Sequence, residues 1–205
     1  VSLGESGVTS GQCYPARCEK LVAMTDVRIP GLVLTDHEFD VPLDHSRPHG
    51  DTIRVYAREV TTPRGAQDRP WLVFFQGGPG FEAFRPLDKG VWVGRALEDY
   101  RVLLLDQRGT GRSTPVRAET VGHLPPGDLA EYLTHFRADS IVADAEAIRR
   151  QLIGDGQWSI LGQSFGGFCA TTYLSRFPES LSEVFITGGL PPLTATPEEF
   201  YQHTF

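Results

Sequence analysis

The chain has 205 residues, of which 40% are hydrophobic and 22% are charged, a composition typical of a globular protein with one hydrophobic core. Its 19 basic and 26 acidic residues give a net charge of −7, which argues against nucleic acid as a partner because phosphate binding needs a local excess of cations. No run of about 18 apolar residues occurs, so we expect no transmembrane helix and no membrane partner. Three cysteines are too few for a disulfide scaffold, and with no secretory signal at the start of the sequence they favour the cytoplasm.

Residues 1–30 lack a regular hydrophobic pattern, and we expect an irregular N-terminal extension there. Cys13 and Cys18 lie in it without a second pair of ligands at zinc-like spacing, so we interpret them as ordinary thiols and expect no metal site. Apolar and polar residues then alternate in residues 32–41 and 53–60, on both sides of a turn-like segment rich in proline and glycine. Two such runs predict an antiparallel hairpin.

Four later apolar runs predict buried strands. Residues 71–75 and 102–105 are continuously apolar, which is typical of strands buried on both faces of a parallel sheet. Residues 158–161 and 184–186 form shorter runs of the same kind.

Helical patterns lie between these strands. A hydrophobic stripe within residues 141–152 predicts a helix that begins near a cap at Asp139, and a second helix is expected over residues 165–177. Strands that alternate with helices predict an α/β fold with a mostly parallel, doubly wound sheet and the hairpin at one edge, in a core that spans residues 31–190. Ligands bind beyond the carboxyl ends of the strands in such sheets, so the loops that follow these strands are the candidates for chemistry.

The loop after Leu161 reads Gly162-Gln163-Ser164-Phe165-Gly166 and lies between a predicted strand and a predicted helix. A sharp strand-to-helix turn of this kind holds a serine hydroxyl clear of the sheet, and it needs small residues two positions before and after the serine. The helix start supplies free N–H groups and a positive dipole end. The pattern therefore predicts a catalytic serine at position 164, and an ordinary Gly/Ser loop is the alternative.

The loop after Phe75 reads Gln76-Gly77-Gly78-Pro79-Gly80. Consecutive glycines allow backbone amides to approach a ligand oxygen closely. Alone, this segment is better interpreted as a tight turn. Beside a catalytic serine it is placed to supply the second N–H of an oxyanion hole, the first being that of Phe165.

The loop after Leu105, residues 106–113, invites comparison with a phosphate-binding loop. That motif would need a glycine at the position of Asp106 and a lysine at the position of Arg112, so we exclude it. We expect Asp106 and Arg108 to form an ion pair with each other that braces the loops beside the site, which is a structural role.

Together the three loops resemble those of a known family. Gly-Gly-Pro-Gly after one strand, Asp-Gln-Arg-Gly-x-Gly-x-Ser after the next and Gly-x-Ser-x-Gly-Gly after the third are similar to motifs of the proline iminopeptidases, or prolyl aminopeptidases, which are serine peptidases of the α/β-hydrolase fold. The resemblance covers residues 32–190, and residues 41–46 are similar to the longer members. Gln76 is a departure, because shorter members carry histidine there, and it leaves the preferred peptide length open.

The resemblance implies an enzyme that releases the N-terminal residue, typically proline, from a peptide with a free N-terminus. Ser164 matches the nucleophile that forms an acyl-enzyme, the N–H of Phe165 matches one oxyanion donor, and the N–H of Gly78 matches the second. Neither a metal nor an organic cofactor is implied.

The resemblance also places the acid and histidine of the triad after two further strands, beyond a helical cap that binds the substrate amine. Residues 191–205 are expected to be the start of that cap, and His203 is the only histidine after Ser164. We interpret the earlier histidines as solvated loop residues: His37, His45, His49, His123 and His135. Our hypothesis is that the chain is the N-terminal part of a longer enzyme or half of a split one, inactive alone, with the C-terminal half as its partner.

Two other functions stay open. Another α/β-hydrolase, such as an esterase or a tripeptidyl aminopeptidase, would share the serine turn, and a non-catalytic remnant would suit the missing acid and histidine. Cys169 lies five residues after Ser164. We expect it either to pack in the core or to lie close enough to the site for bulky thiol reagents to inhibit the enzyme.

Overall fold

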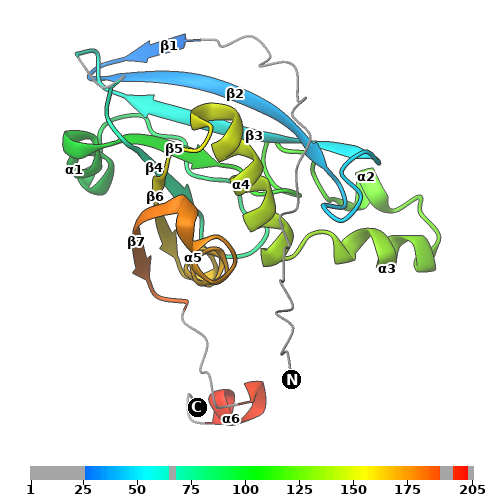
Figure 1. Cartoon of the computed structure of the whole chain (residues 1–205). Helices are drawn as coiled ribbons and strands as arrows, with labels where there is room; N and C mark the ends of the chain where they lie inside the picture. The colour runs from blue at the N-terminus through cyan, green and yellow to red at the C-terminus, as the bar shows by residue number, and fades with distance from the viewer. Residues whose placement is uncertain (1–25, 65–67, 190–195, 203–205) are drawn as a thin grey trace, which may run out of the picture.

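A computed structural model describes residues 26–64, 68–189 and 196–202 of the protein (Figure 1). Within these ranges, seven strands form one mixed sheet in the order β1-β2-β3-β5-β4-β6-β7. The strands are β1 (Asp26–Ile29), β2 (Leu32–Pro42), β3 (Thr52–Thr61), β4 (Trp71–Phe75), β5 (Arg101–Leu105), β6 (Trp158–Gln163) and β7 (Leu181–Thr187). The helices are α1 (Val91–Asp99), α2 (Ala118–Val121), α3 (Pro126–Thr134), α4 (Ala138–Ile153), α5 (Phe165–Arg176), the 3-10 turn η1 (Pro178–Ser180) and α6 (Pro197–Gln202).

The N-terminal part of the sheet is antiparallel. β2 and β3 form the predicted hairpin, in which Phe39 lies opposite Val55. β1 adds a strand to the edge of this hairpin, so the prediction that all of residues 1–30 are irregular is wrong for 26–29. The chain turns from β1 into β2 at Gly31, whose φ of 82 favours glycine. Residues 1–25, with Cys13 and Cys18, lie outside the described residues.

The four predicted strands are confirmed as the parallel strands β4, β5, β6 and β7. The prediction that all four are buried is wrong for β7, which lies at the edge of the described sheet and whose Phe185 is 42% exposed. The chain leaves β4 through α1 to β5 on one side of it, and it returns through α4 to β6 on the other side. The strand order therefore reverses next to β4, and the loops after β4 and β6 diverge at this switch point, where sheets of this class bind ligands. β3 pairs antiparallel with β5 and joins the hairpin to the parallel strands.

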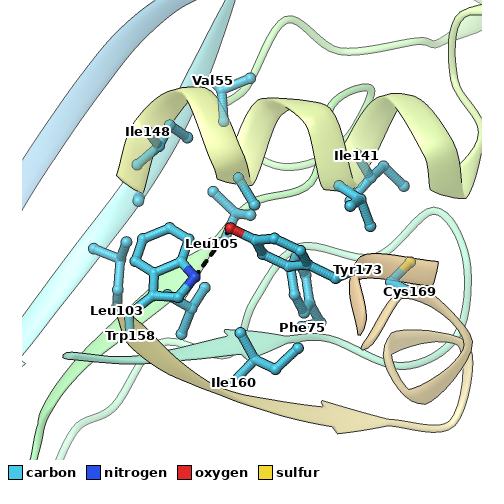
Figure 2. Close-up of a cluster of buried hydrophobic side chains, with 14 of the residues drawn as sticks. Val55, Phe75, Leu103, Leu105, Ile141, Ile148, Trp158, Ile160, Cys169 and Tyr173 are labelled. Carbon is cyan, nitrogen blue, oxygen red and sulfur yellow. Dashed lines mark hydrogen bonds between the residues drawn. The ribbon is translucent and has the colours of Figure 1, made fainter. Parts of the chain in front are cut away.

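Both faces of β4 and β5 are covered, which explains their continuous apolar sequences. One face packs against α4 and α5, which lie on the near side of the sheet in Figure 1. Figure 2 shows this layer, with Phe75, Trp158 and Tyr173 between the sheet and the helices. The opposite face packs against α1 through side chains such as Leu72 and Phe74. Packing on both faces holds β4, the strand that leads into the glycine loop.

The helices differ from the prediction in two details. The N-cap of α4 is Arg137, so the expected cap at Asp139 is wrong. Asp139 lies in the first turn instead, where its carboxylate favours the positive end of the helix dipole. The polar stretch before α4 contains two short helices that the sequence analysis does not predict, α2 and α3, and neither has a buried residue. No helix in the described part of the chain is both long and apolar enough to cross a membrane.

Candidate active site

β6 leads directly into Ser164, the N-cap residue of α5. Its backbone has φ 54 and ψ −118, and within the described ranges it is the only residue other than glycine with a positive φ. A conformation of this kind costs about 1–3 kcal/mol and persists only where the surroundings enforce it. Ser164 is exposed, so its hydroxyl lies at the surface and not in the core. The predicted strained turn is therefore present.

Close backbone contacts explain the glycines on both sides of Ser164. A Cβ atom on Gly162 would lie 2.2 Å from the carbonyl oxygen of Gly166, and a Cβ atom on Gly166 would lie 2.0 Å from the carbonyl oxygen of Phe75. Both separations are far below contact distance, so a larger residue would force the turn open. The N–H of Ser164 also donates to the carbonyl of Thr187 at 3.2 Å, which ties the turn to β7.

The glycine loop after β4 contacts this serine turn. β4 and β6 are neighbours in the sheet, with Phe75 opposite Gly162. A Cβ atom on Gly77 would lie 2.6 Å from the carbonyl oxygen of Gln163 and 3.0 Å from Cβ of Ser164, so this approach requires a glycine. The fold therefore brings the turn at Ser164 into contact with the glycine loop after β4, the two segments predicted to form the site.

Two backbone N–H groups near this junction are free among the described residues. Phe165 is the first residue of α5, so its N–H has no acceptor within the helix, and it donates to no other described group. The N–H of Gly78 likewise donates to no described group. Gly78 has φ 59, which glycine adopts without strain. An exposed hydroxyl and two free donors are components of an acyl-transfer site.

Asp106 and Arg108 do not pair with each other, so that prediction is wrong. The buried carboxylate of Asp106 accepts hydrogen bonds from the guanidinium of Arg85 and from the N–H of Ala83, the latter at 3.0 Å. Arg108 is fully buried and donates to Asp144, with Nε 2.7 Å from Oδ2. The physical reason is that tertiary packing supplies each charge with a partner from a distant segment.

Arg108 also braces the hairpin against α3 and α4. Its guanidinium donates to the backbone carbonyls of Pro42 and Leu43 at the end of β2 and to that of His135 after α3. These contacts join the end of β2 to the segment after α3, and the ion-pair partner of Arg108 is Asp144 of α4.

None of the described histidines forms a hydrogen bond with Ser164. His37 is buried, with Nε2 3.0 Å from a carboxylate oxygen of Glu59, so its interpretation as a solvated residue is wrong. His45 is partly buried, and its Nε2 lies 2.8 Å from Asp144. His49 and His123 are exposed, as expected, whereas His135 is half-buried. His203 lies outside the described residues. No hydrogen bond joins the Ser164 hydroxyl to any described side chain.

Cys169 packs on α5 within the layer shown in Figure 2, where it is fully buried. Burial raises the pKa of its thiol to about 12, so it is not a ready nucleophile. Core packing, one of its two expected roles, is therefore confirmed. Among the described residues, no group of three or more His, Cys, Asp or Glu side chains is placed to hold a metal ion.

Sequence reasoning missed several residues around the site. Phe81 is 67% exposed, and its ring lies against Gly78, where a Cβ atom would be 3.1 Å from the ring. Its position directly after Gly80 is a signal in the sequence that could have identified it. Arg85 and Asp144 are separated by 21 and 36 residues from the charges that they pair with, and no local pattern indicates such partners.

The fold and the serine turn define the class of the protein. Residues 70–203 match the family model of the alpha/beta hydrolase fold, and the chain belongs to this family. Among solved structures, an alpha/beta hydrolase from Novosphingobium aromaticivorans superposes with a TM-score of 0.52 at 19% identity, over 75% of this chain and 43% of that chain. VinJ superposes with a TM-score of 0.50 at 19% identity, over 73% of this chain and 42% of that chain.

More similar relatives are proline iminopeptidases. The chain is 54% identical over 179 residues to a proline iminopeptidase of Aeromonas sobria, covering 86% of this chain and 42% of that protein. It is 44% identical over 188 residues to proline iminopeptidase aneH of Aspergillus aculeatus, covering 86% of this chain and 41% of that protein. These relatives confirm the resemblance that the three loop motifs indicate. The chain spans about two fifths of their length.

Proposed function

We propose that this chain carries the nucleophile and the oxyanion hole of a serine aminopeptidase that releases N-terminal proline from peptides. The observation that carries the proposal is the exposed Ser164 in its strained turn, in contact with the glycine loop. Its similarity to enzymes named proline iminopeptidase supports the choice of substrate.

In the proposed reaction, Ser164 Oγ attacks the carbonyl carbon of the N-terminal residue and its proton passes to a general base. The carbonyl oxygen becomes an oxyanion, which accepts hydrogen bonds from the N–H groups of Phe165 and Gly78. The shortened peptide leaves with a proton on its new amine, and water then hydrolyses the acyl-enzyme to release the free amino acid. No metal or organic cofactor enters this scheme.

We further propose that the base and its acid come from a segment outside this chain, and we call the assembly of chain and segment the intact enzyme. The chain spans about two fifths of the length of its curated relatives, and no described histidine forms a hydrogen bond with Ser164. Without a base the serine hydroxyl stays protonated, and loss of a triad member typically lowers kcat by about 10⁴-fold or more. We therefore expect the chain alone to be inactive.

The proposed partners are this segment and a peptide with a free N-terminus. The proposed compartment is the cytoplasm, supported by the small number of cysteines in the sequence.

The test is labelling of the intact enzyme with a fluorophosphonate, alongside hydrolysis of a proline arylamide and of a short acyl ester. We expect labelling at Ser164, loss of labelling and turnover in Ser164→Ala, and no loss in the control Ser175→Ala, an exposed serine on the same helix. Faster turnover of the ester than of the arylamide would favour an esterase. Full activity in Ser164→Ala would overturn the proposal.

A further inference from the structure

The loop after β5 holds the glycine loop at both of its ends. The glycine loop runs from Gln76, directly after β4, to Ala83, where the chain becomes buried again. Two consecutive residues of the β5 loop, Asp106 and Gln107, contact these two ends. Both are buried, at 0% and 3% exposure, although the loop between the two ends is largely open to solvent.

Gln107 holds the near end. Its Nε2 donates to the carbonyl oxygen of Gln76 at 3.1 Å. The C=O and N–H of a trans peptide point in opposite directions, so this bond fixes the plane of the peptide that joins Gln76 to Gly77. The next peptide along the chain carries the N–H of Gly78.

Asp106 holds the far end. One carboxylate oxygen accepts the N–H of Ala83 at 3.0 Å, and Arg85 donates to both carboxylate oxygens, with Nη1 3.0 Å from Oδ1. The other oxygen accepts the N–H of Arg112 at 2.9 Å. The carboxylate therefore joins the end of the glycine loop to the loop after β5, and charge-assisted bonds of this kind are among the stronger hydrogen bonds.

The loop that carries these two residues is itself held firmly. The hydroxyl and N–H of Thr110 both donate to the carbonyl of Gln107, at 2.7 and 3.0 Å. Ser113 Oγ donates to the carbonyl of Asp106 at 2.6 Å, and the N–H of Asp106 donates to the carbonyl of Tyr56 on β3 at 3.0 Å. These bonds hold the backbone of Asp106 and Gln107 in place, so that their side chains contact the glycine loop from fixed positions.

We propose that Asp106 and Gln107 are positioning residues that set the geometry of the oxyanion hole by holding both ends of residues 77–82. The inference rests on the proposed function. Three of these six residues are glycines, which lose more conformational freedom than other residues when ordered. Oxyanion donors stabilise the transition state only if they are aligned before the charge develops. Fixing both ends of a glycine-rich loop supplies that alignment.

The main test is Gln107→Met in the intact enzyme, which keeps a buried side chain of similar size and removes the donor to Gln76. Loss of a whole oxyanion donor costs about 10²- to 10³-fold in kcat, and displacement by about 1 Å costs up to about 10²-fold. We therefore expect kcat to fall about 10- to 100-fold, with KM unchanged within about twofold. The rate of fluorophosphonate labelling should fall by the same factor, because the phosphonyl oxygen uses the same donors.

The matched control is Thr110→Val, which removes the hydroxyl bond to the carbonyl of Gln107 but keeps the bond from the N–H of Thr110 to the same carbonyl, so Gln107 stays in place and its side-chain amide still bonds to Gln76. We expect both variants to lower the melting temperature by similar amounts, and only Gln107→Met to lower kcat. Asp106→Asn tests the other end, where we expect faster hydrogen exchange at the N–H of Ala83, which the Asp106 carboxylate accepts in the wild type.

The outcomes separate this inference from the proposed function. An active wild-type enzyme whose kcat and labelling rate are unchanged in Gln107→Met would overturn the positioning role and leave the function intact. Equal losses of kcat in Gln107→Met and Thr110→Val would also overturn it, because they would reflect loop stability only. A wild-type enzyme inert to arylamide, ester and fluorophosphonate would overturn the function and, with it, the positioning role.

Discussion

Replacing Glu146 with glutamine should destabilise the layer that supports the serine turn. Glu146 is buried on α4, and its carboxylate accepts hydrogen bonds from Arg149, Arg150 and Tyr173. Tyr173 belongs to α5 and also accepts a hydrogen bond from Trp158 of β6, drawn as a dashed line in Figure 2. The network therefore joins the two helices to the strand that leads into the site.

The structure gives the size of the effect. Burial raises the pKa of Glu146, but hydrogen bonds from Arg149, Arg150 and Tyr173 outweigh it and hold the pKa at about 2, against an ordinary value of 4.5. At about 1.4 kcal/mol per pH unit, this shift corresponds to about 3 kcal/mol of stability at neutral pH. Removal of one partner from a buried ion pair costs a similar amount, about 3–5 kcal/mol. Because the pKa is lower in the folded state, the stabilisation is present above pH 4.5 and is lost as the pH falls towards 2.

The assay is urea unfolding of the intact enzyme at pH 7 and pH 3, for the wild type and for Glu146→Gln. We expect the variant to be less stable by about 3 kcal/mol at pH 7 and by about half of that at pH 3. The control is Glu131→Gln on the exposed side of α3, which should change the free energy of unfolding by less than about 0.5 kcal/mol. A deficit of the same size at both pH values, or no deficit at pH 7, would refute the reasoning.

Three further predictions concern the site. Gly77→Ala should lower kcat about tenfold or more, because its Cβ would lie 2.6 Å from the carbonyl oxygen of Gln163, whereas Gly127→Ala, with no atom within 4 Å, should have no effect on steady-state kinetics. Phe81→Ala should raise KM about threefold to tenfold at constant kcat in arylamide assays, because it removes an exposed ring beside Gly78; an unchanged KM would contradict this. In a background without the other two cysteines, Cys169 should react with a bulky maleimide only in urea, since the folded chain buries it completely, and fast labelling of the native enzyme would contradict this.

Much of the fold is predictable from sequence because its signals are local. The apolar runs of β4 and β5 reflect burial on both faces of the sheet, and each of these strands can be recognised without knowledge of its neighbours. β1 has no such signal: three of the four residues in Asp26–Ile29 are exposed, and the strand exists because it pairs with β2. The strand order depends on contacts between distant segments, and only general rules for α/β folds constrain it.

The site shows the same division. The turn at Ser164 is predictable because its glycines are required by contacts within a few residues and with one neighbouring strand. The partners of Asp106 and Arg108 are not, since Arg85 and Asp144 are brought to them by the packing of separate segments. Whether a polar side chain can be buried likewise depends on whether a neighbouring strand provides a hydrogen-bond partner for it.

His37 illustrates this dependence. It lies opposite Ala57 in the hairpin, and Glu59, two residues further along β3, is near enough to bond to it. A histidine considered alone is expected in solvent, whereas the register of the hairpin supplies the partner that allows it to be buried.

Ser164 and Gly78 follow β6 and β4, two strands that are hydrogen-bonded neighbours in the parallel part of the sheet. Because hydrogen bonds join these two strands directly, we expect their ends to move together. The distance between the Ser164 hydroxyl and the Gly78 N–H should then change little when other parts of the chain move. We expect this pair of loops to keep its geometry when the segment that covers the site is exchanged for another. A new covering segment would change which substrates enter, but not the position of the hydroxyl relative to the N–H group. The two strands and the loops that follow them could therefore serve as a fixed catalytic unit in designed enzymes with different covering segments.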